Sequence, residues 1–483
     1  MRIRFFLATL GLTASACSVG EDYLRPLISA PAAWRESVPA AVAPAPVWPA
    51  ADWWRGFGSP VLDAYMKQAE VANYDLAAAI ARVRQADAQA RISGAPLLPF
   101  LDFSGGAERS QTPSLAPHAS NVGQAKPVVK DSFTASLSVS YELDFWGKNA
   151  AAAESAEAAA AASRFDQQTV ALTVQSSVAT SYFESLGLQD RLQVARANLA
   201  NAETVLAAVR DRVRFGTATE LDSAQQESVV AGLRAVVPPL EQQLRQTANT
   251  LAVLVGRLPE QVAVENGTLA GVVVPAVTPG LPSALLERRP DVRFAEAQLI
   301  GANADMTAAK AALFPSVKLT AEYGFESLAL STLMHSNSVL FSLASNLAQP
   351  IFHGGALEGE RDLRRARYDE LLQNYRKAVV SAFSDVENAI NATRKTAEEE
   401  TAQQAAVTTA KRAYDIAMAQ FRAGLIDITT LLNTQKALFS AEDALAQARL
   451  GHIQAAVGLF KALGGGWLAA QPKDDKTAKP AAG

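Results

Sequence analysis

Two long stretches of this 483-residue chain contain no proline, and they constrain its fold more than any other feature. They span residues 128–237 and 351–471. Inside them, residues 148–215 include a single glycine and residues 360–423 include none. Since proline and glycine are the residues that most disfavour a helix interior, each stretch predicts a helix approaching about 100 Å, at about 1.5 Å per residue.

The spacing of apolar residues agrees with long helices. In the second stretch such residues recur every three or four positions, at Leu371, Tyr375, Val379, Phe383, Val386 and Ile390. Globular helices rarely exceed about 25 residues without a break, so these lengths predict coiled-coil or bundle packing. From these residues alone, an ordinary helical bundle remains an equal alternative.

Four shorter segments alternate apolar and polar residues instead. The clearest are residues 133–145 and 317–326, with weaker alternation in residues 100–109 and 338–349. The pattern is typical both of half-buried soluble sheets and of transmembrane barrel strands. Each pair is separated by a loop and leads directly into a long helix, which favours barrel strands. Because the smallest such barrels have about eight strands, several protomers would have to pool theirs.

The two halves of the chain resemble each other at an offset slightly above 200 residues. Phe145-Trp146-Gly147-Lys148 ends the second strand of the first half, as Ile351-Phe352-His353-Gly354-Gly355 does in the second. Gly216 and Gly424 each follow a long helix, where a left-handed residue is often needed. We therefore predict a duplicated unit of strand hairpin and helices, since a two-repeat solenoid would have much shorter repeats.

The N-terminus has the composition of an export signal. A basic start and an apolar stretch precede Ala14-Ser15-Ala16, and Cys17 follows. We expect cleavage after Ala16, by lipoprotein processing that acylates Cys17 or by ordinary signal peptidase. Beyond this signal no apolar run reaches the roughly 18–20 residues of a membrane-spanning helix, so any membrane crossing would use strands.

Composition and motifs exclude several classes of function. The net charge of −4 argues against a nucleic-acid binder. One cysteine and four scattered histidines cannot form a disulfide framework or a Cys/His metal cluster, so we predict no metal and no cofactor. The chain has no Gly-x-Ser-x-Gly, His-Glu-x-x-His or phosphate-loop motif, and we predict that it is not an enzyme.

Several motifs together resemble the outer-membrane efflux family, in its lipoprotein branch that serves resistance-nodulation-division pumps. The residues that carry the resemblance are Cys17 to Tyr23 with Pro26, Tyr141 to Gly147, Glu287-Arg288-Arg289-Pro290-Asp291-Val292 with Ala295-Glu296-Ala297, Pro350 to Gly355, and Phe421-Arg422-Ala423-Gly424 with Leu431 and Gln435. The sequence departs from this branch at Glu21, where proline is usual, and at Asn433-Thr434, where Asp-Ala is common.

The resemblance implies a mainly α protein with a membrane β part. Its fold would be a TolC-like α-helical barrel, with four strands from each protomer of a homotrimer joining a twelve-stranded β-barrel in the outer membrane. It also implies a lipid anchor at Cys17, a periplasmic adaptor and an inner-membrane pump as partners, and passive conduction of drugs or other toxic small molecules. A duct for type I protein secretion and a structural helical surface lipoprotein are the alternatives.

Under this resemblance the chain divides into five segments. They are a signal peptide (1–16), an extended lipidated segment (17–59), a first repeat (60–270, with its strand hairpin at 100–145), a second repeat (271–470, with its hairpin at 316–349) and a disordered tail (471–483).

The periplasmic gate is expected at the helix turn around Gly424. We expect Asp427 to contribute to a ring of carboxylates and Arg422 to bind a neighbouring helix, with Asp222 a weaker candidate at the matching turn. The alternative for both acids is that they begin the next helix, where a negative charge complements the helix dipole.

Overall fold

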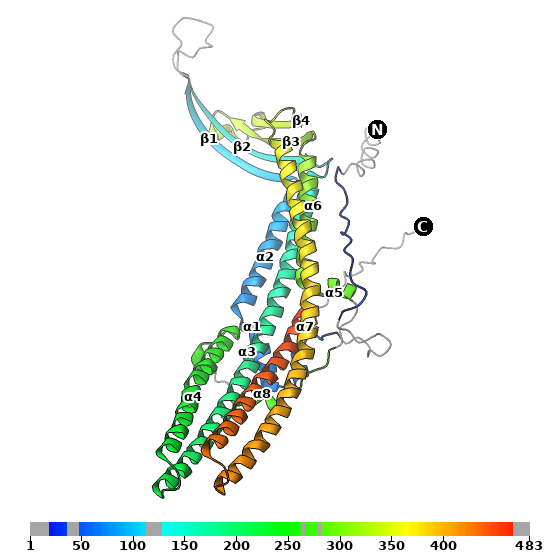
Figure 1. Cartoon of the computed structure of the whole chain (residues 1–483). Coiled ribbons are helices and arrows are strands. Elements are labelled where there is room, and N and C mark those ends of the chain that lie inside the picture. Colours follow the sequence, from blue (N-terminus) through cyan, green and yellow to red (C-terminus); the bar gives the residue numbers. More distant parts are fainter. Residues whose placement is uncertain (1–18, 36–47, 113–127, 263–265, 278–281, 467–483) are drawn as a thin grey trace, which may run out of the picture. The chain divides into compact units, whose positions relative to one another are not determined.

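The computed structural model describes residues 19–35, 48–112, 128–262, 266–277 and 282–466. The helices are α1 (Pro60–Ala72), α2 (Tyr74–Gly94), α3 (Lys148–Arg214), α4 (Glu220–Leu254), α5 (Pro282–Arg288), α6 (Pro290–Ala311), α7 (Ala356–Arg422) and α8 (Ile428–Ala462). The strands are β1 (Phe100–Thr112), β2 (Val128–Leu143), β3 (Ser316–Ser327) and β4 (Val339–Ala348). Figure 1 shows that helices dominate the fold.

The two halves of the chain contain the same elements in the same order. Each half has two helices, two antiparallel strands and two further helices. α3 and α7 are both 67 residues long, and α4 and α8 are both 35 residues long. The internal repeat expected from the motif spacing therefore extends to the lengths of the helices.

The repeats do not coincide with the compact units of the structure. The first unit contains residues 1–26, 83–162 and 295–375, and the second contains the rest of the chain. Each repeat gives its strand hairpin to the first unit and most of its long helices to the second. The predicted division at residue 270 stays a prediction about sequence duplication.

The four strands of the first unit form one antiparallel sheet in the order β1-β2-β3-β4. The register pairs Ser104 with Ser136, whose hydroxyl oxygens lie 2.9 Å apart, and Ser136 with Gly324. A side chain at position 324 would meet the backbone oxygen of Ala135, so glycine permits the close approach of β2 and β3. β1 and β4 are the outer strands of this described sheet.

Large apolar side chains of the outermost strand point into solvent. On β4, Phe341 and Leu343 are about four-fifths exposed, and Leu347 is nearly as exposed. Large exposed apolar side chains of this kind are typical of surfaces that contact lipid or another protein. Among the helices of the described residues, none combines the length and the apolar character needed to cross a bilayer.

The main core lies in the second unit and includes aromatic residues from the N-terminal segment. In a short 3₁₀ helix (Trp53–Phe57), both tryptophans and Phe57 are buried. Trp53 stacks on Phe460 of α8 with 5.0 Å between ring centres. The segment expected to be extended over residues 17–59 thus includes a 3₁₀ helix whose rings lie in the core, because burying large aromatic side chains is favourable.

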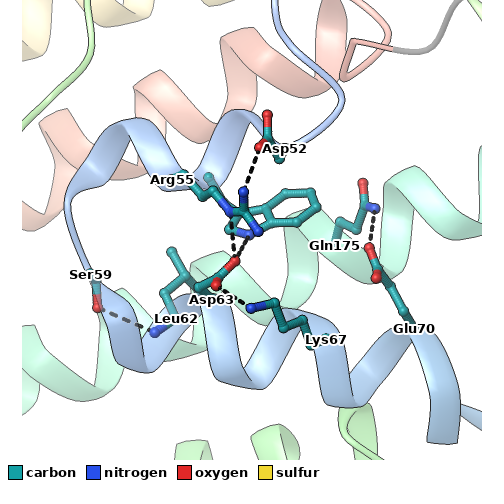
Figure 2. A network of polar contacts seen from close by, with 9 residues as sticks. Asp52, Arg55, Ser59, Leu62, Asp63, Lys67, Glu70 and Gln175 are labelled. Atoms are coloured by element: carbon teal, nitrogen blue, oxygen red, sulfur yellow. Dashed lines mark hydrogen bonds and ion pairs between the residues drawn. The ribbon is translucent and has the colours of Figure 1, made fainter.

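A polar network fixes the start of α1 beside this core (Figure 2). The carboxylate of Asp63 accepts hydrogen bonds from Trp54 Nε1 at 3.1 Å and Arg55 Nε at 3.0 Å, and pairs with Lys67 at 2.8 Å. These bonds, led by that of Lys67, hold the pKa of Asp63 far below its usual value. Ser59 caps the helix by accepting the backbone N–H of Leu62. The network explains why α1 begins where it does.

The proline pair that limits the first long helical stretch does not end a helix. Pro238 and Pro239 both lie inside α4. Their neighbours Val237 and Leu240 pack against residues of α3, and this burial offsets the backbone hydrogen bonds that the two prolines cannot make.

Candidate functional site

The candidate gate is built from two helix turns of the second unit, one between α3 and α4 and the other between α7 and α8. Gly216 and Gly424 have positive φ angles of 72° and 75°. In each turn the next backbone N–H bonds to the carbonyl five residues back, from Thr217 to Arg212 at 2.8 Å and from Leu425 to Gln420 at 2.9 Å. This bond and the left-handed glycine end both helices in the same way.

Asp427 begins α8. Its carboxylate accepts the backbone N–H of Thr430 at 2.7 Å, and its backbone is extended, as is usual for an N-cap. Hydrogen bonds from the Thr430 side chain and from its backbone N–H lower the pKa of Asp427. The carboxylate is exposed and therefore charged at neutral pH. Its capping role is visible within one chain, whereas a ring of carboxylates would require other copies.

The first repeat places Thr219 where the second has Asp427. Thr219 caps α4 by accepting the backbone N–H of Asp222, and Asp222 in turn accepts the backbone N–H of Thr219 at 2.7 Å. This reciprocal arrangement is a capping box, which satisfies two otherwise unpaired donors at the start of a helix. It gives Asp222 a complete structural role and weakens the case that it acts in gating.

Arg422 is the last residue of α7, and its side chain is exposed. Within the described residues its guanidinium forms no ion pair with Asp427 of the same chain. Its positive charge acts on Tyr414, where it partly opposes the burial that raises the pKa of that hydroxyl. An inter-helix ion pair of the Arg422 guanidinium would therefore involve another copy of the chain.

Motif reasoning missed Arg212, which joins the two turns. Its guanidinium donates hydrogen bonds to the backbone carbonyls of Phe421 at 2.7 Å and Arg422 at 3.2 Å. It thereby serves two of the carbonyls left free at the end of α7 and places a positive charge where the helix dipole favours one. The only signal in the sequence is an arginine in the last turn of a predicted helix, which is too common to single it out.

A small apolar core lies next to this bond. Val205 and Val209 of α3 pack with Ala417 and Phe421 of α7 and with Leu431 of α8. Burial of these side chains holds the end of α3 against the second helical pair. Among the described residues, the turns are joined by Arg212 and by this apolar core, which has fewer buried residues than the main core.

The Arg-Arg-Pro-Asp motif has a structural role in the second unit. The side chain of Arg289 is only 11% exposed; it pairs with Asp291 at 2.5 Å and Asp385 at 3.0 Å and donates to the carbonyl of Ala462 at 3.3 Å. Burial alone would lower its pKa, but the bonds and charges of the two aspartates raise it overall. One guanidinium thus connects the start of α6 with α7 and with the end of α8.

Two further predictions concern the lipidation site and metal binding. Cys17, the expected lipidation site, lies outside the described residues. Across the described ranges, no group of three or more His, Cys, Asp or Glu side chains is placed to hold a metal ion.

An open groove lies in the second unit. It lies between α3, α4 and α8 and has a volume of about 570 Å³. Its walls are apolar at Val229, Leu233 and Phe439, and an ion pair between Arg191 and Asp443 at 2.6 Å lies at one side. An apolar groove with a charged rim is suited to an amphipathic helix.

The sequence matches the family model described as outer membrane efflux protein over residues 65–257 and 281–465. It is 44% identical over 415 residues to the pyoverdine export outer membrane protein OpmQ of Pseudomonas aeruginosa, covering 86% of this chain and 87% of that protein. It is 30% identical over 482 residues to the toluene efflux pump outer membrane protein TtgF of Pseudomonas putida, covering 98% and 99%.

Solved structures show the same fold. The outer-membrane channel OprN superposes with a TM-score of 0.85 at 27% identity, covering 93% of this chain and all of that one. The arrangement of strand hairpins and long helices is therefore that of a TolC-like outer-membrane channel.

Proposed function

The chain belongs to the outer membrane efflux protein family and is an outer-membrane component of an efflux system, and from this premise we propose that it conducts small molecules passively to the cell exterior. The observation that carries the proposal is the near full-length match to pump-linked outer membrane proteins, together with the fold shared with a channel. The expected periplasmic helical barrel corresponds to the long helices.

We infer that the working form is a homotrimer with twelve pooled strands. Four strands cannot close a transmembrane barrel, and unpaired edges in lipid leave backbone groups without hydrogen bonds. Pairing β1 of one copy with β4 of the next would remove both edges. The exposed apolar residues of β4 would then face lipid, where their exposure costs nothing.

The conducted compounds are proposed to be small. One relative is named for pyoverdine export and another for toluene efflux, and both names describe small-molecule transport. A duct for type I protein secretion stays the alternative. We propose no catalysed reaction, because a passive path needs only a pore and a gate.

The proposed partners are a periplasmic adaptor and an inner-membrane pump. Relatives named as pump components support this, and the groove between α3, α4 and α8 has the chemistry to receive a helix of the adaptor. We further propose that Cys17 carries a lipid, which would add membrane affinity without creating the channel.

We propose that the gate is the pair of turns described above. Three copies of Asp427 would form an acidic ring near the axis, and Arg422 would bind a helix of the neighbouring copy. Asp222, whose carboxylate is already used in its capping box, is the weakest of the three candidates.

Planar-bilayer conductance of the purified protein tests the proposal. We expect discrete channels of small conductance in the wild type. Folded, membrane-inserted protein that conducts no ions would overturn the channel function and leave a structural lipoprotein as the better account.

A further inference from the structure

An N-terminal strap, residues 19–26, runs along α6 within the first unit. Three of its contacts follow one face of that helix. Gly20 lies against Thr307, the backbone carbonyl of Glu21 accepts a hydrogen bond from Asn303 at 3.1 Å, and Arg25 pairs with Glu296. The contacts move toward the start of α6 as the strap proceeds, so the two run antiparallel.

The spacing of these contacts shows that the strap is extended. From residue 20 to residue 25 an extended chain covers about 17 Å, at about 3.3 Å per residue. From residue 307 to residue 296 an α-helix also covers about 17 Å, at about 1.5 Å per residue. The two lengths agree, so the strap lies along α6 without slack, and its register is fixed at both ends.

The ion pair between Arg25 and Glu296, at the C-terminal end of the strap, is the strongest of these contacts. Arg25 Nε lies 2.9 Å from one carboxylate oxygen of Glu296, and Arg25 Nη2 donates to the other at 3.1 Å. The carboxylate is only 8% exposed, whereas the arginine is 40% exposed. The pair is partly buried and hydrogen-bonded through both carboxylate oxygens, so it stabilises the docked strap.

Neighbouring groups make this a closely packed site. The side chain of Arg25 also forms a hydrogen bond with the side chain of Tyr375. Burial, and then the charge of Glu296, raise the pKa of the Tyr23 hydroxyl. The strap therefore buries polar side chains against α6 and α7, which a loose tether would not do.

The N-terminal end of the strap is held by close steric contact between Gly20 and Thr307. A Cβ atom on Gly20 would lie 2.3 Å from side-chain atoms of Thr307. Thr307 stands about one turn before α6 ends at Ala311, and β3 begins five residues after that, at Ser316. Cys17 is three residues before Gly20, a reach of at most about 11 Å.

We propose that the strap is a spacer of fixed register. Its docking on α6, locked by Arg25 and Glu296, sets the depth at which the N-terminal end of the protein meets the membrane beside the sheet. It docks whether or not a lipid is attached. The inference rests on the proposed outer-membrane placement and extends it, because it gives the anchoring segment its own folded site.

Depth-dependent fluorescence quenching tests the spacer. An Asp22→Cys variant carries a label on an exposed strap residue, and trimers are placed in vesicles whose lipids bear nitroxide quenchers in the headgroup. We expect the same quenching with Cys17 intact and in a Cys17→Ser background. Arg25→Ala and Glu296→Gln should each change the quenching, and the double variant should change it no further than the larger single effect.

Amide hydrogen exchange gives a second readout. Exchange in residues 19–26 should become about tenfold faster or more in Arg25→Ala. Arg234→Ala is the matched control, since it removes an exposed pair of similar length with Glu203 at 2.6 Å. Unchanged exchange and quenching in Arg25→Ala would show that the Arg25–Glu296 pair does not hold the strap on α6. Loss of docking in Cys17→Ser would show that docking of the strap depends on the lipid.

Bilayer conductance separates this inference from the proposed function. Arg25→Ala channels that conduct normally while the strap is released support the spacer and keep the channel. Wild-type protein that never conducts would remove the channel function, and the quenching experiment would still decide where the strap lies.

Discussion

The guanidinium of Arg212 lies 4.4 Å from the centre of the Phe421 ring and donates a 2.7 Å hydrogen bond to the backbone carbonyl of the same residue. A single side chain of the first repeat thus holds both the ring and the backbone at the end of α7. Both contacts are charge-assisted and directional, so they fix how the two helix turns meet.

Arg212→Ala is expected to loosen the two turns. The loss of a partly buried charged hydrogen bond and a cation–π contact corresponds to about 1–2 kcal/mol. We predict larger or more frequent openings in planar bilayers. Arg210→Ala is the control, because it removes an exposed pair with Glu227 on the neighbouring helix. Equal behaviour of the two variants would show that Arg212 has no special role.

Two substitutions of Asp427 separate charge from capping. Asparagine keeps the N-cap acceptor and removes the charge, whereas alanine removes both and costs about 1 kcal/mol of cap stability. If a carboxylate ring closes the pore, both variants should widen it. If Asp427 only caps α8, the alanine variant alone should lower the unfolding temperature, and conductance should stay unchanged in both.

Acid should weaken the network around Asp63. Its pKa is depressed in the fold, so its contribution is present above the pKa of the unfolded chain and is lost as pH falls through the lower, folded value. Unfolding temperatures of wild type and Asp63→Asn should therefore differ at pH 7 and converge in strong acid. If the difference in unfolding temperature persists undiminished at low pH, the destabilisation by Asp63→Asn comes from altered packing or hydrogen bonding and not from the lost charge.

Arg289→Ala should be among the most destabilising single changes. It leaves two aspartates and a carbonyl without their shared partner, and we estimate about 2–3 kcal/mol, because both aspartates are partly exposed. Arg289→Lys should recover little, since an ammonium cannot replace the planar fork. Heat-induced loss of helical circular dichroism measures this, with Arg234→Ala as the exposed control.

Gly464 and Gly216 form a matched pair for testing whether a glycine is required because a side chain would clash. Both have positive φ angles, 88° and 72°, but a Cβ at 464 would lie 2.3 Å from the backbone oxygen of Arg288, while at 216 it would meet nothing. Gly216→Ala should cost only the backbone strain, about 1–2 kcal/mol. Gly464→Ala should cost clearly more, and similar unfolding temperatures for the two variants would refute the clash.

The sequence by itself determined the regular parts of this fold. Apolar residues at helical spacing in stretches without proline predict long helices, and alternation in residues 133–145 and 317–326 predicts strands with two unlike faces. The glycines at 216 and 424 mark helix ends for the same local reason. Each of these signals involves residues that are close together in the sequence, so it can be recognised without knowledge of the tertiary structure.

Only the tertiary structure decided which distant residues meet. Arg212 and Phe421 are 209 positions apart, and Arg25 and Glu296 are 271 apart. No local pattern distinguishes these arginines from others at helix ends or in extended segments. Their partners are set by how the helices and the N-terminal strap pack, and packing depends on the whole chain folding at once.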